Sequence, residues 1–209
     1  MELSPMSKLL RSFQALALLE LIAFAGVAMA QQDGSWCAPA EASLRSSARG
    51  DTYHRAIRDL VGCPVSGPQA LAAQWAHPPE DTVALQILGD ASATLRDRRL
   101  LRAATSAALN TSNRREVRLT AIQALLGQFH PSLKAVYRTP AEPGLGGVAY
   151  VMLAEQDHPN DRPGAEPLPP SAQDDVLNVL RQLSSDQDEV IRKISDYLVG
   201  RLPSFQGPK

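Results

Sequence analysis

The pattern that most constrains this fold is a stretch at residues 113–129 that recurs in similar form before and after itself. It begins with Asn113, a residue type that caps helices, followed by a charged first turn. Its apolar residues recur at steps of three and four, which places them on one side of an α-helix: Val117, Ala121, Ala124, Leu125 and Phe129, with Ile122 and Leu126 widening the face. Similar stretches at residues 80–91 and 186–199 predict a repeat protein.

A second predicted helix precedes each of these stretches, at residues 68–76, 97–109 and 172–183. Another helix is predicted at residues 51–61, with Asp51 as its N-cap. Val83 lies 34 residues before Val117, and Val190 lies 73 residues after it, close to two further periods. A period in the thirties made of two helices and a turn is typical of an α-solenoid. Only 5% of the residues are aromatic, which favours closely packed helices over a β-sandwich.

The second helix of each predicted pair carries a recognisable order of residue types: an acidic residue, a valine, a basic residue and then an Ala/Leu/Ile face. Residues 115–122 and 188–194 show it best, whereas residues 80–85 lack the basic residue. This pattern resembles HEAT repeats over residues 67–129 and 171–202. The resemblance implies an all-α, HEAT-like superhelix of about three and a half helix pairs that serves as a scaffold and carries no catalytic residues. In this pattern the valine closes the buried stripe, and the arginine packs its stem while its charged head stays in water.

Residues 131–170 depart from the repeat. Seven prolines and four glycines lie between His130 and Pro170, and they exclude a continuous helix pair. Two short β-prone runs, at residues 133–137 and 148–153, predict a β-hairpin or an irregular insertion. A degenerate helix at residues 147–155 is an open alternative. Long loops of this kind often carry binding residues, and a solvated loop without a partner is the other interpretation.

The N-terminus has the features of a secretory signal peptide at residues 1–30. Lys8 and Arg11 precede an apolar run at residues 13–27, and Ala28-Met29-Ala30 matches a cleavage site. We therefore expect an exported chain, periplasmic or secreted, that starts near Gln31. An uncleaved anchor helix is the alternative, although Glu20 within the apolar run weakens it.

Cys37 and Cys63 are the only cysteines in the chain. In an exported protein such a pair predicts a disulfide, which would staple an N-terminal helical segment at residues 31–66. Closing a loop of this length contributes about 3 kcal/mol in the chain-entropy model. A redox or metal-binding thiol pair is the alternative, but the chain has no Cys-x-x-Cys spacing and no clustered histidines.

Motifs that would indicate catalysis are not found in the sequence. The four histidines stand apart from metal-ligand spacing, and no nucleophile elbow or phosphate-binding glycine loop occurs. The sequence therefore predicts a protein that is not an enzyme and needs no cofactor or metal. The alternative is a helical accessory domain with a ligand or catalytic site at the 131–170 insertion, where His130, Asp157 and His158 would have to converge.

The centre of the chain is basic, although the net charge of the whole chain is only −1. If adjacent helices bring these side chains to one surface, they form the candidate partner-binding residues: Arg98, Arg99, Arg102, Arg114, Arg115 and Arg118. The expected partner is another protein. No aromatic residues alternate with the arginines, so nucleic acid is not expected, and no membrane contact is expected after signal cleavage. Ordinary solvated helix faces, or repeats that stack end to end, are the rival interpretations.

The predicted organisation is therefore a signal peptide at 1–30, a stapled segment at 31–66, HEAT-like repeats at 67–130, an insertion at 131–170, a last repeat at 171–202 and a tail at 203–209.

Overall fold

A computed structural model describes residues 36–45, 50–130, 133–137, 149–153 and 168–205, and the statements below concern these residues. They form eight α-helices, a two-stranded sheet and a final 3-10 turn. The elements in chain order are α2 (Cys37–Arg45), α3 (Asp51–Val61), α4 (Ser66–Gln74), α5 (Thr82–Thr94), α6 (Arg98–Leu109), α7 (Arg115–Phe129), β1 (Leu133–Tyr137), β2 (Ala149–Leu153), α8 (Ala172–Leu183), α9 (Glu189–Arg201) and η2 (Leu202–Phe205).

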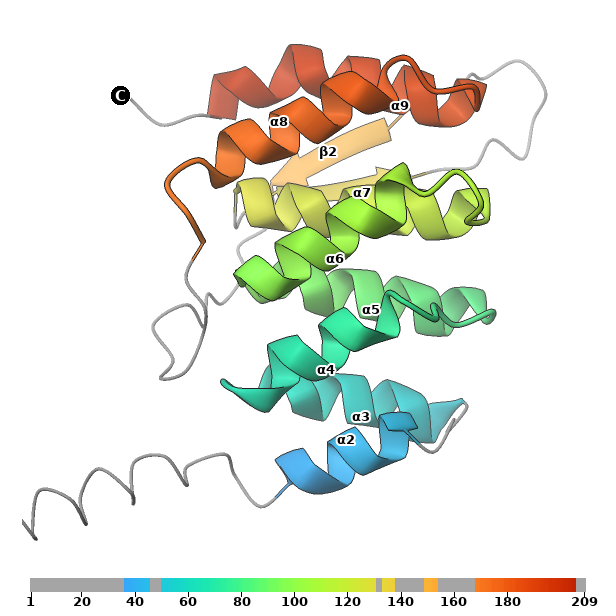
Figure 1. Ribbon diagram of the computed structural model, residues 1–209, viewed down its shortest axis with the longest axis vertical. Coiled ribbons are helices and arrows are strands. Elements are labelled where there is room, and N and C mark those ends of the chain that lie inside the picture. Colours follow the sequence, from blue (N-terminus) through green and yellow to red (C-terminus); the bar gives the residue numbers. More distant parts are fainter. Residues whose placement is uncertain (1–35, 46–49, 131–132, 138–148, 154–167, 206–209) are drawn as a thin grey trace, which may run out of the picture. The chain divides into compact units, whose positions relative to one another are not determined.

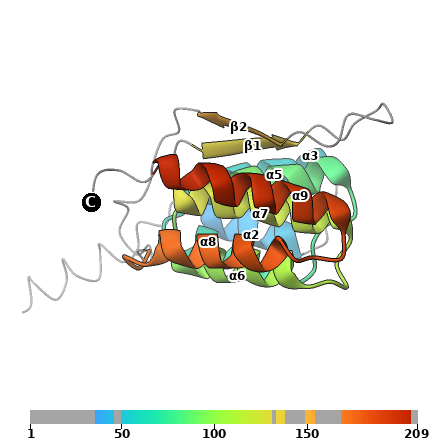
Figure 2. The same ribbon diagram turned by 90° about the horizontal axis from the view of Figure 1, so that it is seen from above.

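The helices pack as successive pairs in two layers. Helices α2, α4, α6 and α8 form one layer, and α3, α5, α7 and α9 form the other (Figure 1, Figure 2). Each helix contacts its partner in the pair and the next helix of its own layer. The described residues thus hold four helix pairs, because the segment between the two cysteines forms a complete pair, α2 and α3.

The predicted helices are all present, and α3 and α8 have the predicted bounds. Aspartates begin three of them: Asp81, Asp97 and Asp188 accept hydrogen bonds from first-turn amides of α5, α6 and α9. Two predicted caps are wrong. Gly50, with a positive φ of 58°, is the N-cap of α3, and Asp51 is its first helical residue. Arg114 is the N-cap of α7, because the Asn113 side chain donates instead to the carbonyl of Ala107 at 3.0 Å.

The three valines that set the predicted period do not occupy equivalent positions. Val83 and Val190 are each the second residue after the N-cap of their helix, which is the position of Glu116 in α7. Val117 is the third residue after its N-cap, which is the position of the buried residues Ala84 and Ile191 in their helices. Val83 is consequently 55% exposed and does not close a buried stripe. The spacing between equivalent positions is still in the thirties, because the N-caps Asp81 and Arg114 are 33 residues apart.

Helix α7 is buried on every side. All residues from Val117 to Phe129 except Thr120 are buried, including Gln123 and Gln128. It contacts α5 and α9 in its own layer, α6 and α8 in the other, and β1 on the side that faces away from that layer (Figure 2). Such a central position requires side chains that are either apolar or hydrogen-bonded around the whole circumference.

The strands β1 and β2 pair antiparallel, from Leu133 opposite Leu153 to Tyr137 opposite Ala149. The two strands form the β-hairpin that was one of the predictions for the insertion. Strand β2 lies within residues 147–155, for which the alternative prediction was a helix. Leu133 is fully buried where the hairpin meets α7. The other predicted parts of the insertion, residues 138–148 and 154–167, lie outside the described residues.

Small residues bring α5 and α7 unusually close. A Cβ on Gly127 would stand 2.5 Å from Cα of Ala93, and one on Gly89 would overlap the Thr120 methyl group. Near the same crossing Gln128 donates to the carbonyls of Ser92 and Leu95, at 2.6 and 2.8 Å. Its amide oxygen also accepts from the amide of Asp97 at 3.2 Å. One buried side chain thereby satisfies the end of α5 and the start of α6.

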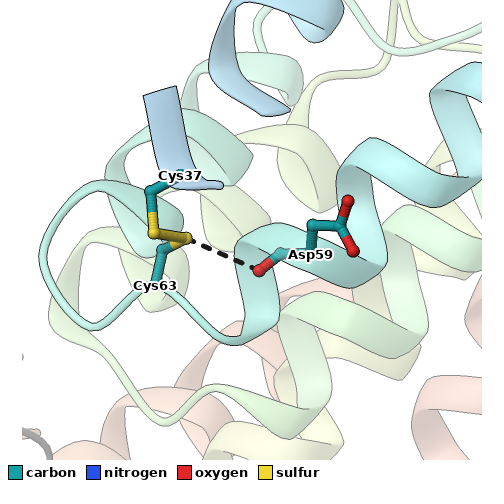
Figure 3. The surroundings of a disulfide bond; sticks show 3 residues. All are labelled: Cys37, Asp59 and Cys63. Atoms are coloured by element: carbon teal, nitrogen blue, oxygen red, sulfur yellow. Dashed lines mark hydrogen bonds between the residues drawn. A yellow bond between two sulfur atoms is a disulfide. The ribbon is translucent and has the colours of Figure 1, made fainter. Parts of the chain in front are cut away.

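The predicted disulfide is confirmed: Cys37 and Cys63 are bonded, with their Cα atoms 5.8 Å apart (Figure 3). The bond joins the start of α2 to the turn after α3, and both residues are buried. The Sγ atom of Cys63 lies 3.5 Å from the carbonyl oxygen of Asp59. This is a packing contact, because a disulfide sulfur carries no hydrogen to donate. Among the helices described, none is long and apolar enough to cross a membrane.

Candidate partner-binding surface

Two edges of the helix layers hold the candidate arginines. We call the first the disulfide edge, formed by Trp36, residues 62–65, residues 95–97 and His130. Hydrogen bonds between Arg99 and Val65 and from Gln128 to Leu95 hold it together. We call the opposite edge the acidic-turn edge, formed by residues 79–81, 110–114 and 184–188.

Arg118 is a buried structural residue of the acidic-turn edge. It is 4% exposed, its Nε donates to the carbonyl of Ala108 at 2.9 Å, and its two terminal nitrogens bind both carboxylate oxygens of Asp186. The hydrogen bond from Arg118 lowers the pKa of Asp186. The prediction that the head of this arginine stays in water is therefore wrong. The reason is that the turn before α9 brings Asp186 over it, 68 residues away in sequence.

Arg115 and Arg114 also bind within the chain. Arg115 Nε lies 2.6 Å from a carboxylate oxygen of Asp188, whose other oxygen caps α9. Partial burial alone would raise the pKa of Asp188, but the hydrogen bonds from Arg115 and from the α9 amides together lower it. Arg114 donates to the carbonyls of Pro79 and Glu80, at 3.0 and 3.3 Å. These contacts join three successive helix pairs along one edge.

Arg99 belongs to the disulfide edge. Its guanidinium group binds both carboxylate oxygens of Asp97, and its third contact is the carbonyl of Val65 at 3.3 Å. Arg98 and Arg102 are exposed one turn apart on α6. The structure therefore does not gather the six arginines on one outer face. Arg99, Arg114, Arg115 and Arg118 bind groups of neighbouring elements. Arg98 and Arg102 are exposed on α6.

Exposed apolar residues on the disulfide edge were missed by the sequence reasoning. Trp36 and Val65 are 54% and 45% exposed, and Arg96 nearby has a buried Nε atom without a hydrogen-bond partner. Burial lowers the pKa of the Arg96 guanidinium. Both residues lie outside the predicted helices, so no apolar spacing indicated whether they face water.

The histidines and acidic residues do not assemble into a metal site within the described residues. His77 is exposed, His54 and His130 are half-buried, and Asp174 and Asp175 are exposed in the first turn of α8. His158 and Asp157, which the accessory-site alternative requires, lie outside the described residues.

A scan against protein-family models gives no match, and searches of the curated proteins and of the solved structures find no significant match.

Proposed function

We propose that this chain is an exported, HEAT-like repeat protein that binds another protein and acts as a non-enzymatic scaffold. The observation that carries the proposal is the regular stacking of four helix pairs in two layers. Repeats of this kind offer extended surfaces whose side chains are free to vary, because each pair needs only its neighbours for stability.

The edge contacts support the HEAT-like part of the proposal. Arg114 reaches back to the turn before α5, and Arg115 and Arg118 reach forward to the turn before α9. All three arginines lie at the start of α7, so this one helix pair contacts the turn of the pair before it and the turn of the pair after it. This is the behaviour expected of stacked repeats with nearest-neighbour interfaces.

The exported location rests on two features. Residues 1–30 have the charge and apolar pattern of a signal peptide, and the buried Cys37–Cys63 disulfide is of the kind that persists in oxidising compartments. Sequencing the N-terminus of the protein recovered from the envelope or medium tests this part. A chain that begins near Gln31 supports export with cleavage, and a chain confined to the cytosol with free thiols contradicts it.

The binding function is tested by affinity capture from the organism's own envelope extract, with residues 31–209 as bait. We expect one protein to be retained at a fixed stoichiometry. The matched variants change the exposed arginines, Arg98→Glu with Arg102→Glu, and a control pair on another surface, Arg55→Glu with Arg58→Glu. Retention of no protein by a folded, disulfide-bonded bait contradicts the scaffold function.

A further inference from the structure

We draw no further inference here: the strongest candidate, the exposed apolar surface of Trp36 and Val65 on the disulfide edge, carries nothing because the residues directly before Trp36 lie outside the described residues and nothing in the structure shows what covers it.

Discussion

At the residue scale, two glycines allow α5 and α7 to pack closely. A methyl group on Gly127 would meet backbone atoms of Ala93, which cannot rotate away as a side chain can. The two helices would therefore have to separate, and the buried contacts of Gln128 at the same crossing would lengthen.

We predict that Gly127→Ala lowers the free energy of unfolding by about 1–3 kcal/mol, the usual cost of overpacking. The matched control is Gly200→Ala in α9, where a Cβ atom meets nothing within 4 Å. It should be neutral or stabilising by up to about 1 kcal/mol, because alanine is the better helix former. Urea denaturation of the three proteins checks both; equal effects of the two substitutions would contradict the packing argument.

A second residue-scale prediction concerns the buried pair of Arg118 and Asp186. Arg118→Ala leaves the Asp186 carboxylate without its partner and should cost about 3–5 kcal/mol. Lys193→Ala breaks an ion pair of which both side chains are more than half exposed, and it should cost far less stability than Arg118→Ala does.

The same pair predicts how stability depends on pH. The pKa of Asp186 is lowered in the folded protein, so its contribution is complete above the unfolded pKa of about 3.9 and is lost as the pH falls through the folded value. Asp186→Asn should therefore lose less stability than the wild type between about pH 4 and 2. Thermal unfolding across this range measures the difference, and parallel curves would show that Asp186 is not coupled to folding.

At the scale of elements, α2 depends on the disulfide more than any other helix does. It has nine residues, too few for a helix that is stable by itself, and it lies at the end of its layer. Three of its residues, Cys37, Ala40 and Leu44, are buried. The bond to Cys63 therefore supplies a constraint that the two inner pairs receive from a second neighbouring pair.

Replacing both cysteines by serine should lower the free energy of unfolding by about 3 kcal/mol in the chain-entropy model. Hydrogen exchange should accelerate first in α2 and the turn after α3, while α7 keeps the slowest amides because it is buried on every side. Uniform acceleration along the chain would show that the disulfide stabilises the whole unit instead of one helix pair. The wild type treated with iodoacetamide under native conditions is the control, since its buried disulfide offers no thiol.

At the scale of the whole molecule, the last helix pair is attached to the others through few polar contacts. Asp186 and Asp188 bind α7, and Gln173 donates to the carbonyl of Phe129 at 3.2 Å. The insertion separates α8 and α9 from the preceding pair in sequence, so the chain itself does not hold them in register.

We therefore predict that Asp186→Ala with Asp188→Ala uncouples α8 and α9 from the first three pairs. Their amides should lose protection at lower urea than those of α5 to α7, which turns one unfolding transition into two. Asp174→Ala with Asp175→Ala, which changes two exposed aspartates of α8, should leave a single transition. A single transition in the first variant too would show that apolar packing alone couples the pairs.

The sequence by itself determined the helices, their pairing and the disulfide. Apolar spacing acts within one or two turns, so α3 and α8 could be predicted to the residue. Two cysteines allow only one bond within a chain.

Only the tertiary structure decided which charged and apolar residues face water. Arg118 is buried because Asp186 approaches it from another helix pair. Burial depends on contacts between distant segments, and no local pattern contains them.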